Sequence, residues 1–533
     1  MILFHAQMLD QMSATIRARL HSLQIAVRLL TPVCVVLLCA PAMGADLGRD
    51  CCADLEARIA ELETTAVRDS HRKFSLSISG TVGEGLLIWD DGVQHKAYVT
   101  DSPAAARPRF RFTGSAMLDP GWTTGYLLEI GLRANRADTV SQRPVFARRL
   151  GDPLPTNGAP PSASELVGGG ADGVGSRETD VRHSVWWIEN KHSGRIWIGH
   201  TSDAADGITE LNLANTGHFA SLQIQDYVNG FQLRNPNTSL GLQFSNLWNG
   251  LRAGANPGDG DRYDVIKYDS PEIAGFKGSA SWGEADQWGL ALRYAGTFSD
   301  YKLAAGIAYS TSSDGYAINS ATHLPQNGTR GCAKIIGPSA SGHGTSCSEV
   351  GLSASIMHSP TGLYFYGAYG IKNDANREEI SGLKAVAIHR DDEFYYLQGG
   401  IEQNFVSAGR STLFGEFFNG TYGPINGTPV AADTTVESAA RSCDSAYSGR
   451  NGTGGTNGGF GGTGYLSFTG CAGYLTRANV SMWGVGFNQH IDAAAMDVYV
   501  VYRDFSATAF DSTGHHSNFG GFRFVSTGAV IKF

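Results

Sequence analysis

The stretch that decides the fold runs from residue 109 to residue 133 and reads RFRFTGSAMLDPGWTTGYLLEIGLR. From Phe110 to Leu118 every second residue is apolar or small, and most residues between them are polar or charged. A similar alternation returns from Tyr126 to Leu132, after the turn sequence Asp-Pro-Gly-Trp at 119–122. Successive side chains of a strand point to opposite faces of a sheet. The stretch therefore predicts a β-hairpin with one apolar face and one polar face.

This two-residue period dominates the chain from Phe74 onward. The last apolar column consists of Val525, Thr527, Ala529, Ile531 and Phe533. A strand that crosses a bilayer needs about 9–11 residues, which these alternating runs supply. The final column thus predicts a lipid-facing strand at the C-terminal end.

The connections between the runs sort by length. Short ones, such as 191–194 and 359–362, alternate with long ones, such as 136–179 and 420–476. Bacterial outer-membrane barrels join their strands by short periplasmic turns and longer outer loops. The sequence predicts an all-β fold, a transmembrane antiparallel β-barrel over 73–533, with 18 strands by direct count. If the weak hairpin near 228–248 is loop, the count falls to 16; either number leaves a water-filled lumen.

Composition excludes several other classes. Charged residues make up 17% of the chain, below the usual quarter, and there are 68 Gly and 18 Pro. The net charge of −9 disfavours nucleic acid as a partner, because phosphate binding needs a basic surface. The sequence contains no GxSxG, HExxH or phosphate-loop motif, so we expect no enzymatic activity, no cofactor and no metal. The adjacent His515 and His516 are interpreted as bystanders on an outer loop.

The N-terminal part predicts export. Residues 1–44 have the pattern of a signal peptide, with Arg17, Arg19 and Arg28 before an apolar run at 29–39 that is too short to span a bilayer. Residues 45–72 predict a short periplasmic helix. Its apolar residues have coiled-coil spacing, and a frayed amphipathic helix is the alternative. They are Leu55, Ile59, Leu62 and Ala66.

Four cysteines fall in two Gly/Ser-rich stretches. Cys332 precedes Cys347, and Cys443 precedes Cys471. In an oxidising compartment the natural prediction is a disulfide bond within each loop, and free thiols are the alternative.

Residues 52–91, which begin CADLEARIAELE and continue through SLSISG to WDD, resemble the start of the alphaproteobacterial porins. Weaker similarities lie at 199–208, at 263–271 and in the final strand. The resemblance implies a 16-stranded barrel in the outer membrane of a Gram-negative bacterium, assembled as a homotrimer. It implies passive diffusion of small hydrophilic solutes and a terminal Phe533 that the barrel-assembly machinery reads. Outer-membrane lipid and lipopolysaccharide are the further expected partners.

The resemblance also implies a loop that folds into the lumen, at about 201–227. Acids on this loop would face charged residues on the polar face of the wall, and such a pair of surfaces sets a transverse field across a pore. The alternative is that these are solvated charges with no special placement. The predicted constriction residues are Arg109, Arg111, Glu129, Arg133, Asp203, Asp206, Glu210 and Asp226. Arg182 and Arg195 are not assigned, because Trp186 and Trp187 break the alternation between them.

The first functional hypothesis is a general porin, a water-filled diffusion channel. The alternative is a solute-specific or gated channel of the same fold, which the long loops at 136–179 and 420–476 motivate. A second alternative is a secreted β-rich adhesin or glycan-binding protein, which the Gly/Ser/Thr-rich stretches motivate.

Overall fold

The chain divides into two compact units, Met1–Arg72 and Lys73–Phe533. The computed structural model describes residues 74–101, 107–140, 142, 178–234, 241–247, 256–283, 286–312, 347–374, 389, 391–423, 429–430, 473–511 and 516–533, all in the second unit. The predicted signal peptide, the predicted helix at 45–72 and the three cysteines at 332, 443 and 471 lie outside these residues.

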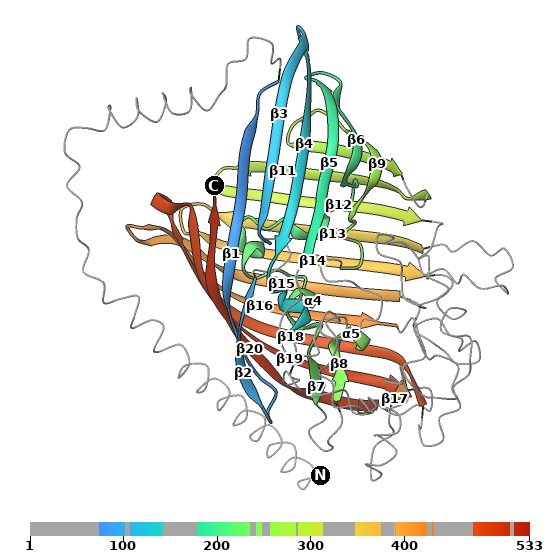
Figure 1. Ribbon diagram of the computed structural model, residues 1–533, viewed down its shortest axis with the longest axis vertical. Coiled ribbons are helices and arrows are strands. Elements are labelled where there is room, and N and C mark those ends of the chain that lie inside the picture. Colours follow the sequence, from blue (N-terminus) through green and yellow to red (C-terminus); the bar gives the residue numbers. More distant parts are fainter. Residues whose placement is uncertain are drawn as a thin grey trace, which may run out of the picture. The chain divides into compact units, whose positions relative to one another are not determined.

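Sixteen antiparallel strands form a closed barrel (Figure 1). They are β1 (Ser77–Asp90), β3 (Arg109–Asp119), β4 (Trp122–Arg133), β5 (Glu178–Asn190), β6 (Gly194–Ser202), β9 (Arg262–Asp269), β10 (Phe276–Gly283), β11 (Trp288–Phe298), β12 (Tyr301–Ser312), β13 (Cys347–His358), β14 (Leu363–Asp374), β15 (Asp391–Val406), β16 (Gly409–Tyr422), β18 (Gly473–Ile491), β19 (Met496–Asp511) and β20 (His516–Lys532). The last strand pairs with the first from Thr81 with Lys532 to Asp90 with Arg523, which closes the sheet. The predicted all-β barrel is confirmed.

The predicted count of 18 strands is wrong, and 16 is right. The hairpin near 228–248 consists of β7 (Gln232–Arg234) and β8 (Gly241–Gln243), which pair with each other. Its pairing with the wall is between Arg234 and Gly520. In the wall itself β6 pairs directly with β9. Alternation cannot distinguish a wall hairpin from one that packs inside the barrel, since both have one apolar face.

The shorter elements are few. β2 (His95–Asp101) pairs with the second half of β1, and β17 (Pro429–Val430) pairs with the start of β18. The helical segments are single turns: η2 (Ala137–Thr139), η3 (Ile208–Glu210), η4 (Thr216–His218), α4 (Gln225–Val228), α5 (Phe244–Leu247) and η6 (Asp492–Ala494). No helix among the described residues is long and apolar enough to cross a bilayer.

Short turns lie at one end of the barrel, between β3 and β4 and between each of six later strand pairs of the described chain. Gly362 shows why such turns need particular residues. Its φ is +67°, and a Cβ there would lie 1.7 Å from the backbone oxygen of Glu402. At the opposite end most connections are long, but 284–287 and 512–515 are short as well. The connection between β19 and β20 is short because these strands run to Asp511 and from His516.

The outer face of the barrel is apolar. On β11 the side chains of Leu290 and Leu292 are 53% and 47% exposed, whereas Ala291 between them is 8% exposed and faces inward. Trp282 and Trp288, paired on neighbouring strands, are exposed near the loop end, and Phe298 is exposed at the turn end. An apolar band bordered by aromatic side chains is typical of a barrel that spans a membrane. The outward column of β20 ends at Phe533, whose ring packs 5.9 Å from that of Phe110.

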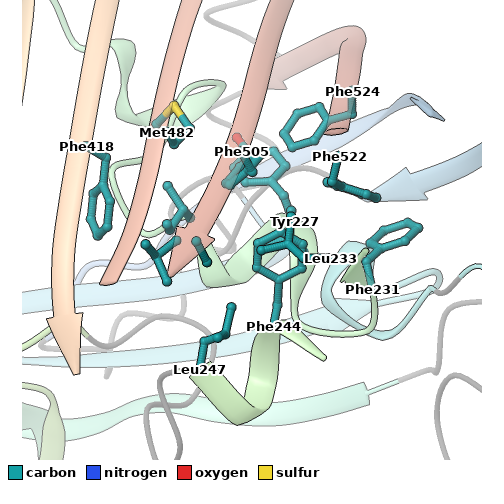
Figure 2. Close-up of a cluster of buried hydrophobic side chains, with 14 of the residues drawn as sticks. Tyr227, Phe231, Leu233, Phe244, Leu247, Phe418, Met482, Phe505, Phe522 and Phe524 are labelled. Carbon is teal, nitrogen blue, oxygen red and sulfur yellow. The ribbon is translucent and has the colours of Figure 1, made fainter. Parts of the chain in front are cut away.

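The chain between β6 and β9 lies inside the barrel. Its described residues are 203–234, 241–247 and 256–261, and we call them the inner segment. Figure 2 shows how Tyr227, Phe231 and Phe244 of this segment pack on inward-facing side chains of β19 and β20. The ring of Phe522 lies 4.8 Å from Phe231 and 5.4 Å from Phe244. The segment is therefore longer than the loop predicted at 201–227.

Candidate pore constriction

The inner segment starts at a turn that Asp203 holds. Its Oδ1 accepts hydrogen bonds from the backbone N–H groups of Ala205 (3.0 Å) and Asp206 (2.8 Å), and its Oδ2 accepts one from Gln287 (2.6 Å). Burial, followed by the nearby Asp206, raises the pKa of Asp203 well above its usual value. One turn later Ile208 packs on Ala291 of β11 and Ala308 of β12. This attachment directs the chain into the lumen.

Three arginines of the wall converge on one buried carboxylate, Glu129. Nε of Arg182 donates to Oε1 (2.7 Å), Nε of Arg111 donates to Oε2 (2.6 Å), and Nη1 of Arg109 donates to Oε1 (3.3 Å). Glu129 is fully buried, while the side chain of Arg111 is 43% exposed and faces the lumen. One negative and three positive charges leave a net positive cluster, which we call the arginine cluster. Because a carboxylate fixes charged donors in defined positions, Glu129 orients the three side chains.

The Asp206 carboxylate of the inner segment lies beside two further arginines of the wall, Arg262 and Arg293. Oδ2 of Asp206 accepts a hydrogen bond from the Ser202 hydroxyl and lies 3.8 Å from Nη2 of Arg262. Arg293 of β11 donates to the backbone oxygen of Asp206 at 2.9 Å. Burial opposes ionisation of Asp206, but Arg262 and the Ser202 hydroxyl outweigh it and lower the pKa of this carboxyl. Asp206 is therefore a negative charge beside the positive wall.

Two further acids on the inner segment behave differently. Asp259 accepts hydrogen bonds from the backbone and hydroxyl of Thr209 (2.8 and 2.6 Å) and from Gln223 (3.2 Å), and burial raises its pKa to about 7. Burial, together with Asp259 and Asp206, also raises the pKa of Glu210 well above its usual value. Near neutral pH the Asp259 carboxyl therefore holds a proton part of the time. The gap between wall and segment is consequently more positive than a formal count of charges indicates.

The predicted residues divide into three groups: members of the arginine cluster, half-buried acids of the inner segment, and residues enclosed elsewhere. Arg109, Arg111 and Glu129 form the arginine cluster, and Asp206 and Glu210 lie on the inner segment. Three others are buried. Asp203 holds the turn, Asp226 is enclosed on α4, and Arg133 is bound to Asp101 and Asp138, with Nη2 2.9 Å from Oδ1 of Asp101.

Sequence reasoning missed Arg182, Arg262, Arg293 and Asp259. Arg182 lies at a bulge, where the pairing of β4 with β5 shifts between Glu129 and Ile130 and two successive side chains turn inward. The bulge lies at 182–183 and not at Trp186 and Trp187, whose pairing with β4 is regular. Asp259 lies outside the inward loop predicted at 201–227.

Two other predictions concern metal binding and disulfide bonds. Among the described residues no group of three or more His, Cys, Asp or Glu has an arrangement that could hold a metal ion. Cys347 is disulfide-bonded, but its partner is not among the described residues, so the pairing with Cys332 stays a prediction.

No protein-family model and no curated protein matches the sequence. Solved structures similar to this chain include the anion-selective porin from Comamonas acidovorans, at 11% identity and a TM-score of 0.42 over 86% of this chain and 100% of that one. OprB of Pseudomonas putida is 10% identical, with a TM-score of 0.44 over 90% and 97%. OmpT of Vibrio cholerae, in a trimer form, is 9% identical, with a TM-score of 0.43 over 87% and 100%. At these values the function has to be inferred from the chain's own geometry.

Proposed function

We propose that this chain is an outer-membrane porin, a non-enzymatic channel for passive diffusion of small hydrophilic solutes, and that it prefers anions. The observation that carries the proposal is the contrast between its two faces. The outer face is an apolar band, and the inner face bears the arginine cluster opposite a partly protonated acidic segment. Clusters of fixed charge at a narrow point of an aqueous pore select permeating ions by sign.

The test is reconstitution into planar bilayers, with current recorded in potassium chloride and the reversal potential measured across a salt gradient. We expect stepwise conductance and a reversal potential of the sign that chloride permeation gives. A folded, detergent-solubilised barrel that never conducts would refute the porin proposal, and cation preference would refute the anion preference alone.

A solute-specific channel of the same fold is the second candidate, because the inner segment packs on one wall and fills that part of the lumen. Saturable block by a single solute would favour it over general diffusion. The apolar outer face disfavours the secreted adhesin, since such a surface aggregates in water without detergent.

The proposal extends to the oligomeric state, the family and the assembly of the barrel. We infer a homotrimer of the alphaproteobacterial porin kind, inserted by the barrel-assembly machinery through the strand that ends at Phe533. The sequence similarity at 52–91 supports the family and the trimer. A slow-migrating form in unheated gel electrophoresis, which cross-linking identifies as three copies, is the expected result.

A further inference from the structure

Two tryptophans face the lumen next to the turn between β5 and β6. Trp187 and Trp197 are paired across these strands, with ring centroids 6.1 Å apart. Their neighbours Trp186 and Ile196 are exposed on the outer face, so alternation places the pair inside. The tryptophans lie toward the turn end of the wall, away from the arginine cluster at the other end of β5.

Cations cover both indoles. The guanidinium carbon of Arg195 lies 4.2 Å from the ring centroid of Trp187 and 4.8 Å from that of Trp197, and Nζ of Lys267 lies 5.5 Å from Trp197. Trp187 also lies close to Gly125, where a Cβ would be 2.3 Å from Cζ2 of the indole. Since Trp187 contacts the Gly125 backbone and a cation, and Trp197 faces two cations, the pair is a poor platform for stacking a neutral sugar. The indoles instead hold the two cations in position.

Arg195 and Lys267 have N–H donors that make no hydrogen bond within the described part of the chain. Arg195 bonds to Oε2 of Glu189 at 2.5 Å, and its side chain is 29% exposed. Within the described part of the chain, the ammonium group of Lys267 makes no hydrogen bond and no ion pair. The neighbouring carboxylate of Asp269 is occupied by the indole N–H of Trp197 (2.9 Å) and the hydroxyl of Ser279 (2.7 Å). Lys277, 3.8 Å from Asp269, adds another positive charge.

We propose that Arg195 and Lys267, held on Trp187 and Trp197, form a binding station for compact oxyanions with two or more negative charges, either carboxylates or phosphates. We call it the indole–cation station. A guanidinium donates to two oxygens of such an anion in a planar fork, and an ammonium adds a point charge. The inference rests on the proposed porin function: an anion that passes the arginine cluster meets the station before it leaves at the turn end.

The experiment measures block of chloride current by citrate, by inorganic phosphate and by maltose, in wild type and in variants. Arg195→Gln and Lys267→Gln each remove a charged donor, and we expect the half-blocking citrate concentration to rise about tenfold, as for loss of one hydrogen bond to a charged group. Trp197→Leu removes the support and should raise it a few-fold. Comparison of citrate with phosphate shows which oxyanion the station prefers.

Arg410→Gln is the matched control. Arg410 is also an inward-facing arginine at the turn end, paired with one carboxylate (Glu402, 3.2 Å), but on β16. Its removal should change the half-blocking concentration less than twofold. Equal effects of Arg195→Gln and Arg410→Gln would overturn the station in favour of a diffuse field. Block by maltose that depends on Trp197 would overturn it in favour of a sugar site.

Calorimetric titration of citrate into the detergent-solubilised protein separates this inference from the porin proposal. Binding that Arg195→Gln weakens, in a protein that does not conduct, would leave the station standing and remove the channel. Conductance with no citrate binding would do the reverse. Heat-shifted gel mobility identifies any variant that fails to fold, and Lys267→Gln then tests the station independently.

Discussion

The two halves of the inner wall differ in the chemistry of their inward side chains. On β3 to β6 and β9 several inward side chains are charged, and Glu129 binds three arginines. On β18 to β20 and β1 they are mostly apolar, and residues such as Met482, Phe505 and Phe522 bury the inner segment. We call the first the charged wall and the second the apolar wall. A water-filled barrel needs a polar interior only where water passes.

Packing on the apolar wall also affects the charged wall, because the inner segment contacts both. Burial of a Phe side chain stabilises a fold by about 1.5–3 kcal/mol, and several rings of the inner segment are buried at once. This attachment holds the middle of the segment, whereas Asp203 and Ile208 attach its start, where Asp206 lies 3.8 Å from Arg262. We therefore expect packing on the apolar wall to limit movement of the whole segment, and each wall can be tested separately.

The largest expected effect is on the apolar wall. Phe522→Ala removes a ring that contacts Trp89, Phe231, Phe244 and Phe505. We expect the free energy of unfolding to fall by about 3–5 kcal/mol, the usual cost of truncating a buried Phe. Urea unfolding in detergent measures it, and open-channel noise should rise as the segment loosens. Phe487→Ala, on the lipid-facing side of β18, is the control, and an equal loss there would contradict the contrast between the faces.

Substitution of Glu129, the central residue of the charged wall, should lower the free energy of unfolding somewhat less than Phe522→Ala does. Glu129→Gln leaves three guanidinium groups without their shared carboxylate. Breaking a buried ion pair costs about 3–5 kcal/mol, but water reaches Arg111, so we expect about 2–3 kcal/mol in the same unfolding measurement. Glu402→Gln, whose partner Arg410 is exposed, should cost less than about 1 kcal/mol. Similar costs for both variants would show that Glu129 does not organise the cluster.

The difference between the walls also explains what the sequence could predict. On β3 and β4, apolar-out and polar-in alternation is regular enough to predict the strand faces and the lumen-facing Arg109 and Arg111. On β20 the alternation predicts the outward column ending at Phe533, although its inward side carries the buried Phe522, Phe524 and Val530. The closed barrel follows from those strands and their short turns. Nothing in the period distinguishes β7 and β8 from wall strands, because Leu233 alternates as a lipid-facing residue would, yet it packs inside.

The site was harder to predict because it depends on pairing between distant strands. Glu129 meets Arg111 across β3 and β4, which the hairpin at 109–133 already implies. Its bond with Arg182 requires the bulge in β5, and the contact of Asp206 with Arg262 requires β6 to pair with β9 across a long inner segment. Burial is equally invisible in sequence: Arg133 and Asp226 have the residue type of a pore lining but not its exposure.

The next expected effect concerns the ion selectivity that the charged wall provides. Arg109→Ala with Arg111→Ala removes two cations from the charged wall. A unit charge about 4 Å from a permeating ion is worth about 1 kcal/mol in water, so the anion/cation permeability ratio should fall about three- to tenfold. Reversal potentials in a potassium chloride gradient measure the ratio. Arg410→Ala is the control on the other side of the lumen, and no change in the double variant would remove these residues from the constriction.

The smallest effect concerns the proton on Asp259. Below pH 7 this carboxyl is mostly neutral, and above pH 7 it is mostly ionised. The ionised form adds a negative charge that offsets the arginine cluster. The anion preference should therefore decline by about twofold as pH rises from 6 to 8. Neighbouring Asp206 stays ionised throughout because its pKa is lowered, whereas burial and the nearby Asp259 raise the pKa of Glu210. His218, with a pKa lowered to about 4 by burial, stays neutral over this range. Asp259→Asn should flatten the profile while His218→Gln leaves it intact, and a profile that moves only with His218→Gln would place the titrating group elsewhere.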